Sequence, residues 1–381
     1  MTTAKGKTMT KFAWQLRSQL HLLTGFIAGF VCAFVLLLHI YDVRNGINCS
    51  TTTAISSSSS IRSFIGTSAA SMSLAQFETE LQWKVASARV LCMVLTCPEY
   101  VERYAQHVYA TWGRRCTKLV FVSSEDYEPL GVVQVVDADG GSYDDLWNKT
   151  REGFRHVWQE YGEEYDWFLK ADDDTYVIME NLHHMLSAYD ANMPLYFGYQ
   201  MRRYNVSYMS GGASYVLSRE ALRRFMKQAY GFDQICPEAR KMGIEDFYMG
   251  ICLQNVGVHL IDSTRAMADD DKPKFFPLNV ESFLYNGNES IPTWLHEMSV
   301  SEIDTGLNCC SNYSIAFHYT KPERMYLYEF LLYHLRVFGK KWSAEQLPRR
   351  WTFSEMVEMF PLENNSEILD LRQMSEKPDN F

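Results

Sequence analysis

Residues 166–177 read Asp-Trp-Phe-Leu-Lys-Ala-Asp-Asp-Asp-Thr-Tyr-Val. The stretch begins apolar, as a buried strand would, and continues into three consecutive carboxylates, Asp172, Asp173 and Asp174. Adjacent anions repel one another, and a fold commonly holds them together at a strand end because a hard divalent cation prefers carboxylate oxygens. The alternative is a solvated turn, and the surrounding chain decides between the two.

Short apolar runs alternate with helical patterns around this stretch. We expect strands at Arg89–Thr96, Lys118–Ser124, Val132–Asp137 and Asp166–Lys170. We expect helices after Pro98, between Tyr143 and Tyr161, and at Glu180–Tyr189. Such alternation predicts an α/β fold with a mostly parallel central sheet, in which ligands lie beyond the carboxyl ends of the strands. The acidic triplet follows such an end, which favours a binding site over a solvated turn.

Two further segments continue the pattern. Gly211 and Gly212 precede an apolar strand, where glycine permits close backbone approach or a positive φ, and Ser218 is placed to cap the helix that follows. Glu245 and Asp246 open another helical pattern. Carboxylates suit a helix N-terminus electrostatically, which is their structural explanation.

The N-terminal region has the pattern of a membrane anchor. Residues 1–21 are basic without an acidic residue, and residues 22–41 are uncharged and long enough to span a hydrocarbon core of ~30 Å. The length of this span and the lack of a small-x-small site disfavour a cleaved signal peptide. The positive-inside rule then predicts a type II membrane protein with a flexible Ser/Thr-rich stem at 42–80, a lumenal body at 81–345 and a C-terminal extension at 346–381.

Other features agree with a lumenal body. The net charge of −10 disfavours nucleic-acid binding. An oxidising compartment predicts disulfides among the cysteines that remain when Cys32 and Cys49 are set aside, and their spacing is not that of a zinc site. N-glycosylation sequons begin at Asn48, Asn148, Asn205, Asn288, Asn312 and Asn364.

The body resembles the core 1 β1,3-galactosyltransferases, of the β1,3-glycosyltransferase family that also includes the Fringe enzymes. The matching segments occur in order at Arg89–Thr96, Thr111–Cys116, Leu146–Thr150, Asp166–Val177, Gly211–Ser218, Glu245–Asp246 and Phe317–Arg336. The resemblance implies a GT-A fold and transfer of galactose from UDP-galactose to the 3-hydroxyl of GalNAc on Ser or Thr. It also implies a Mn²⁺-dependent homodimer in the Golgi.

The resemblance also implies roles at the metal site. Asp174 and His318 are expected to ligate the ion, with Asp172 a further candidate ligand. Asp172 and Asp173 are expected to position the ion, ribose or sugar. An imidazole beside carboxylates favours Mn²⁺ over Mg²⁺. A core histidine packed between two aromatic residues is the alternative for His318.

An inverting transfer needs a base for the acceptor hydroxyl, and one carboxylate suffices. Asp246 is the expected base, and Glu245 is the other candidate. The nucleotide sugar is expected to contact Thr96 and Gly212, and Arg114 or Arg115 is expected to support the diphosphate unless both are simply solvated.

The resemblance pairs Cys92 with Cys116, Cys236 with Cys252 and, as a vicinal disulfide, Cys309 with Cys310. Cys97 is then left over, either free or paired between chains.

Two departures from the family pattern concern recognition. Ser214 stands where the family usually has glycine. Residues 291–308 offer one aromatic, Trp294, for the acceptor sugar, although sugar recognition relies on aromatic faces. A related transferase with another donor or acceptor is therefore an alternative. A non-catalytic lumenal chaperone is a second, disfavoured by the intact acidic motif, and a membrane-anchored lectin is a third without a positive signal.

Overall fold

The computed structural model describes residues 88–137, 143–237, 244–267, 271–285, 291–339 and 351–362, all within the compact unit Met72–Phe381. The predicted cytosolic tail, membrane anchor and stem lie outside these residues. Within the described ranges, no helix is long and apolar enough to cross a membrane.

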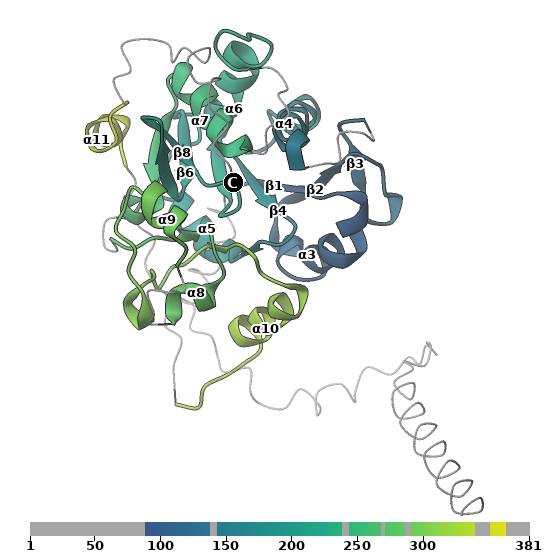
Figure 1. Ribbon diagram of the computed structural model, residues 1–381, viewed down its shortest axis with the longest axis vertical. Helices are drawn as coiled ribbons and strands as arrows, with labels where there is room; N and C mark the ends of the chain where they lie inside the picture. Colours follow the sequence, from purple (N-terminus) through teal and green to yellow (C-terminus); the bar gives the residue numbers. More distant parts are fainter. Residues whose placement is uncertain are drawn as a thin grey trace, which may run out of the picture. The chain divides into compact units, whose positions relative to one another are not determined.

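A seven-stranded sheet forms the centre of the domain, in the order β10-β6-β9-β4-β1-β2-β3 (Figure 1). Its strands are parallel except β9, which runs antiparallel to both neighbours. The strands are β1 (Val90–Leu95), β2 (Lys118–Ser123), β3 (Val132–Gln134), β4 (Trp167–Asp172), β6 (Leu195–Gly198), β9 (Tyr215–Ser218) and β10 (His259–Asp262). The predicted α/β fold with a mostly parallel sheet is confirmed.

Helices cover both faces of the sheet. Figure 1 shows α4, α6 and α7 on one side and α3 and α5 on the other. These helices are α3 (Gln106–Ala110), α4 (Leu146–Tyr161), α5 (Met179–Leu186), α6 (Arg219–Arg224) and α7 (Glu245–Asn255). Ser218 caps α6 as predicted, because its side chain accepts a hydrogen bond from the Ala221 amide. The helix expected after Pro98 is divided into a 3₁₀ turn, a π-helical turn and the short α3.

Strand register brings chemistry-bearing residues together at one edge. All six residues of β1 are buried, as expected of a central parallel strand. Leu95 is paired with Asp172, so β1 and β4 end side by side. Residues Thr96 and Asp173, which follow these ends, therefore lie at the same edge of the sheet.

A small sheet places a C-terminal segment beside that edge. It consists of β11 (Phe275–Phe276), β12 (Ala316–Phe317) and β5 (Tyr176–Val177), and β12 runs antiparallel to β5. Because Phe317 pairs with Tyr176, the chain after β12 turns back toward the acidic triplet.

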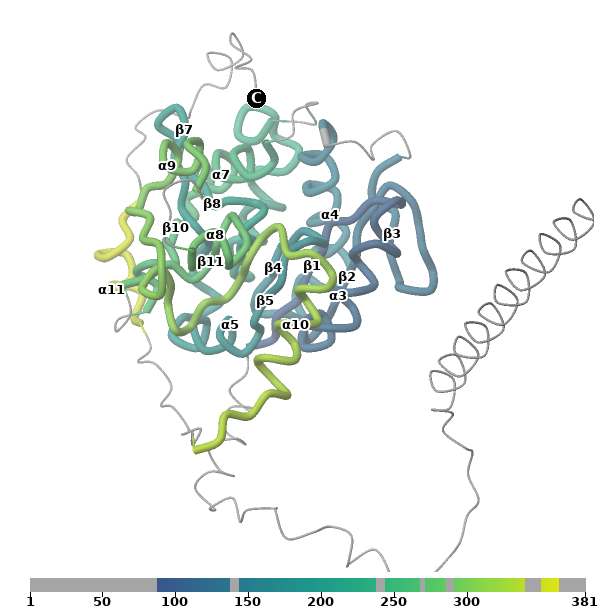
Figure 2. Tube along the Cα trace, turned by 60° about the horizontal axis from the view of Figure 1, so that its bottom comes forward, coloured from purple at the N-terminus to yellow at the C-terminus, as the bar shows by residue number. Residues whose placement is uncertain are grey.

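The region 264–316 is more regular than the sequence predicted. Besides β11, it contains α8 (Val280–Leu284) and α9 (Thr293–Met298). The polar, Pro/Asn-containing sequence shows no helical periodicity here, because each of these helices is shorter than two turns. The remaining elements are a hairpin of β7 (Gln200–Arg203) and β8 (Val206–Met209), and helices α10 (Pro322–Tyr333) and α11 (Phe353–Met359), all traced in Figure 2.

The three predicted disulfides are present, joining Cys92 to Cys116, Cys236 to Cys252 and Cys309 to Cys310. Cys97 is a free thiol.

Candidate active site

A cavity of about 950 Å³ lies where β1 and β4 end. Its walls come from many separate parts of the chain, which explains why no single motif defines it. Among them are Leu95–Cys97 after β1, Asp172–Asp174 at the end of β4, Gly211–Gly212 before β9, the start of α7, and His318–Tyr319 after β12.

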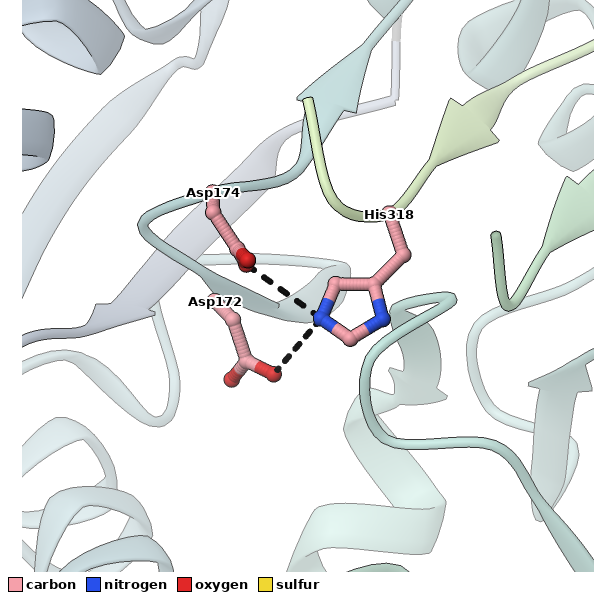
Figure 3. A group of neighbouring side chains, drawn as sticks. All are labelled: Asp172, Asp174 and His318. Carbon is pink, nitrogen blue, oxygen red and sulfur yellow. Dashed lines mark ion pairs between the residues drawn. The ribbon is translucent and has the colours of Figure 1, made fainter. Parts of the chain in front are cut away.

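Three potential metal ligands converge at this cavity. Single ligand atoms of Asp172, Asp174 and His318 all lie within 4.8 Å of one another. His318 Nε2 is 3.2 Å from an Asp174 oxygen and 3.9 Å from an Asp172 oxygen, as Figure 3 shows. Two carboxylates and an imidazole form a donor set that fits Mn²⁺.

The orientation of His318 is fixed from its other side. Its Nδ1 lies 3.2 Å from the carbonyl oxygen of Pro277, so a proton on Nδ1 leaves Nε2 facing the carboxylates. The ring also stacks on Tyr319, with centroids 3.8 Å apart. Metal-binding histidines are typically oriented by such a hydrogen bond at the second nitrogen.

Glycine 212 makes room for that ring. A Cβ at this position would collide with the His318 imidazole. Gly212 lines the cavity, and its closeness to His318 is a reason for glycine that the sequence did not reveal.

Asp173 is not one of the three clustered ligands. Its side chain is 6% exposed and accepts a 2.6 Å hydrogen bond from the Thr96 hydroxyl. Burial raises the pKa of Asp173 to about 8. Asp173 and Thr96 thus join the ends of β4 and β1. Buried Lys149 donates to the Thr96 carbonyl at 3.0 Å and lines the cavity, a residue that sequence reasoning missed.

Sequence reasoning also missed Lys170. This fully buried lysine in the middle of β4 lies 2.7 Å from Asp172 Oδ1 and 2.7 Å from Glu245 Oε1. Asp172 therefore uses one oxygen for Lys170 and directs the other toward His318. A charged residue within an otherwise apolar strand was the available signal, because a buried charge requires partners.

The two candidate bases differ in their surroundings. Glu245 is 2% exposed, is held by Lys170, and accepts a 3.3 Å hydrogen bond from the Tyr215 hydroxyl. Burial raises the pKa of Glu245 to about 7. Asp246 is partly exposed to the cavity and accepts a 2.9 Å hydrogen bond from the Gly211 amide. Burial also raises the pKa of Asp246, which suits a group that must accept a proton.

Arg114 and Arg115 do not support a diphosphate in this cavity. Neither is among the described residues that line it. Both guanidinium groups bind Glu329 on α10 instead. The sequence-based expectation for these arginines is therefore replaced by a role in holding α10.

Trp294 and Ser214 have separate positions. Trp294 on α9 lines the cavity and is 39% exposed. Ser214 is fully buried with a φ of +70°, the left-handed region that favours glycine. This backbone conformation explains the glycine that the family usually has there.

This fold and this cavity identify the class of enzyme that the chain resembles. A mostly parallel sheet with an Asp-x-Asp turn, a converging histidine and a cavity-facing carboxylate fits a glycosyltransferase of the GT-A type.

Comparisons with known proteins agree. The Fringe-like family matches residues 85–268. The chain is 40% identical over 272 residues to the Xenopus laevis glycoprotein-N-acetylgalactosamine 3-beta-galactosyltransferase 1, covering 70% of this chain and 71% of that protein. The chain therefore belongs to the glycoprotein-N-acetylgalactosamine 3-beta-galactosyltransferase family, as the motifs predicted.

More distant relatives match a smaller share of the chain. The beta-1,3-glucosyltransferase of Mus musculus is 24% identical over 185 residues, covering 47% of this chain and 36% of that protein. Chondroitin sulfate synthase 3 of Homo sapiens is 26% identical over 184 residues, covering 43% of this chain and 20% of that protein.

Proposed function

We propose that the chain transfers galactose from UDP-galactose to the 3-hydroxyl of GalNAc linked to Ser or Thr, with inversion at the anomeric carbon. The observation that carries the proposal is the placement of Asp172, Asp174 and His318 in one cavity with Asp246. The name of the relative that is 40% identical supports the choice of sugar and acceptor.

Asp172, Asp174 and His318 would hold a divalent cation, and the mixed oxygen and nitrogen donors favour Mn²⁺. When bound, such an ion acts as a Lewis acid that stabilises the charge of a departing diphosphate. Lys170 keeps the Asp172 carboxylate in place for this role by binding its Oδ1.

Asp246 would accept the proton of the attacking 3-hydroxyl. Its Oδ2 is held by the Gly211 amide, which fixes the carboxylate at the cavity wall. Glu245 is less suited, because it is 2% exposed and held by Lys170 and Tyr215, whereas Asp246 is partly exposed to the cavity. A single base is sufficient for an inverting transfer, since no covalent intermediate needs to be hydrolysed.

Lys149 supplies positive charge on the nucleotide side, where Arg114 and Arg115 do not reach. Its ammonium lies beside Thr96, and burial lowers the pKa of Lys149. We assign the uridine diphosphate to the wall that Thr96, Lys149 and Gly212 form.

Trp294 would contact the acceptor sugar. The low aromatic content of residues 291–308 is the observation that favours a second candidate, a β1,3-glycosyltransferase with another donor or acceptor. The names of the more distant relatives include a glucosyltransferase. The proposal also includes the type II anchor, the Golgi location and the homodimer expected from the sequence.

A panel of donors and acceptors tests the proposal. The full-length protein in detergent micelles is assayed for UDP release with UDP-galactose, UDP-glucose and UDP-GalNAc, each with GalNAc-threonine peptide and with other sugar acceptors. We expect turnover with UDP-galactose and the GalNAc peptide, lost in Asp174→Ala. Turnover only with another pair supports the second candidate. Absence of turnover with every pair favours the chaperone alternative.

A further inference from the structure

A second ion cluster lies on α10, away from the residues that line the cavity. Glu329 accepts two hydrogen bonds from Arg115, at 2.9 and 2.6 Å. Arg114 and the Tyr176 hydroxyl also donate to Glu329, the latter at 3.3 Å. The ring of Tyr333 covers the Arg115 guanidinium at 3.6 Å. Glu329 thus has partners from two other segments, residues 114–115 and β5.

This cluster is built to be rigid. The Glu329 side chain is 8% exposed and that of Arg115 is 18% exposed. Burial opposes ionisation of Glu329, but the hydrogen bonds from Arg115 outweigh it and lower the pKa of Glu329. A bidentate arginine–carboxylate pair fixes orientation as well as distance.

Short connections join the cluster to the candidate metal ligands. Tyr176 lies two residues after Asp174 and pairs with Phe317, the residue directly before His318. The Thr320 amide donates to the Asp174 carbonyl at 2.7 Å. Because α10 begins four residues after His318, a displacement of this helix would be transmitted to the turn that carries the imidazole.

The segment that supplies Arg115 also holds the other ligand-bearing turn. Trp112, three residues before Arg115, is fully buried and donates from its indole nitrogen to the Thr175 carbonyl at 2.9 Å. Thr175 directly follows Asp174. Residues 112–115 therefore fix both the turn after β4 and, through Glu329, the helix after His318.

We propose that Glu329 is a positioning residue for the metal site: bound by Arg115 and Tyr176, it fixes the separation of His318 from Asp174 and so sets the cation affinity of ligands that it does not touch. The inference rests on the proposed function, because it requires a cation at Asp172, Asp174 and His318. Partners outside the ligand shell typically change metal affinity by about 10- to 100-fold.

Cation binding by the full-length protein in detergent tests this directly. Mn²⁺ is titrated in the presence of UDP, and the loss of the free-ion electron paramagnetic resonance signal gives the affinity. Glu329→Gln removes the charge but keeps the shape, and Tyr176→Phe removes one hydroxyl. Arg324→Gln is the matched control, because it breaks an exposed ion pair of the same helix with Glu281. Unfolding temperatures are measured without cation.

We expect about 10- to 100-fold weaker Mn²⁺ binding in Glu329→Gln and about 2- to 10-fold weaker binding in Tyr176→Phe, the range for one hydrogen bond. The Arg324→Gln control should bind as the wild type does. At saturating Mn²⁺, kcat should return toward the wild-type value, whereas a merely structural role would lower the unfolding temperature and leave the affinity unchanged.

Unchanged Mn²⁺ affinity in Glu329→Gln and Tyr176→Phe overturns the inference while the proposed function stands. If Glu329→Gln does not fold, Tyr176→Phe decides alone, since its change is small. A wild-type protein that binds no Mn²⁺ with UDP removes the proposed metal site and this inference with it, a result distinct from equal binding by wild type and variants.

Discussion

Two clusters of buried charge are joined to the Asp172–Asp174 turn, and they differ in the ratio of acid to base. In the first, Lys170 serves two carboxylates, those of Asp172 and Glu245. In the second, Glu329 receives two guanidinium groups. The first cluster has one more carboxylate than it has cations and lines the cavity, whereas the second carries no excess of acid and does not line it.

The difference in acid-to-base ratio agrees with the proposed cation site at the first cluster. Excess carboxylate beside Lys170 leaves Asp172 Oδ2 directed at the cavity and contributes to the raised pKa of Glu245. In the second cluster Arg115 also pairs with Glu180, so two arginines balance two glutamates, and their guanidinium groups keep Glu329 ionised. Buried carboxylates without enough cations indicate a binding site, and balanced or basic clusters indicate structural support.

Removal of Lys170 has the largest expected effect. Lys170→Met leaves two carboxylates without their cation, which should cost about 3–5 kcal/mol of unfolding free energy and abolish activity. Arg115→Met should cost less, because Arg114 still donates to Glu329. Denaturant unfolding compares the two.

The double variant Lys170→Met/Glu245→Gln serves as the control. It removes one unpaired charge, so it should recover part of the stability and none of the activity. Equal stability losses in the Lys170 and Arg115 variants, with no recovery in the double variant, would contradict the contrast between the clusters.

Within the first cluster, Asp246 and Glu245 should separate by function. Asp246→Asn should lower kcat by about 10²- to 10⁴-fold, the usual contribution of a general base, with little change in unfolding temperature. Compared with Asp246→Asn, Glu245→Gln should change the stability more and kcat less. The reverse ranking of kcat values would transfer the role of base to Glu245.

The two clusters should also respond to pH in opposite directions. Glu245 has a folded pKa of about 7, above its ordinary value of 4.5, so the folded state binds its proton more tightly and the stability it contributes is lost as pH rises between these values. The pKa of Glu329 is lowered below 4.5, so its contribution is present above that pH and is lost as pH falls below it.

Thermal unfolding without cation measures this difference. The stability of wild type relative to Glu245→Gln should decrease from pH 5 to pH 8, as the sign of its shift requires. The stability of wild type relative to Glu329→Gln should stay constant over that range and decrease below pH 4.5. If both stability differences changed with pH in the same direction, the two carboxylates would share one environment and the contrast between the clusters would be contradicted.

The smallest effect is expected at Ser214, next to the strand residue that pairs with Lys170. Ser214→Gly should raise stability by about 1 kcal/mol, because glycine adopts the positive φ of this position without steric penalty. Activity should not change. A loss of stability would show that the buried hydroxyl makes a favourable contact that outweighs the strain.

The sequence predicted what depends on pattern and spacing. Apolar runs gave the strands, and the family motifs gave the three disulfides and the residues Asp172, Asp174 and His318 that the fold brings together. Asp246 faces the same cavity. These features are local in sequence or repeat a shared motif, so a single chain is sufficient to find them.

What the sequence did not predict are the partners of charges that lie far apart in the chain. Arg115 and Glu329 are separated by 214 residues, and neither segment contains a pattern that indicates the other as its partner. From the sequence alone, two arginines near a predicted nucleotide site are expected to contact phosphate. In the structure a carboxylate on α10 binds both arginines, because β12 places α10 beside residues 112–115.

The acceptor side was hard to predict for a related reason. Helix α9, which carries Trp294, spans six residues and has a single buried one, Leu295. Such a short element has too few turns for an apolar periodicity to appear. Its position in the cavity wall depends on packing against the β7–β8 hairpin, where an isolated bridge joins Met201 to Ser299.

The linkage formed by the wild-type protein tests the central claim most directly. UDP-galactose and a GalNAc-threonine peptide are incubated with the full-length protein and Mn²⁺, and the product is analysed by nuclear magnetic resonance. The account predicts a β-linked galactose on the 3-hydroxyl of GalNAc, formed by wild type and not by Asp174→Ala. An α-linked product, a sugar on another hydroxyl, or equal yield from Asp174→Ala would contradict it.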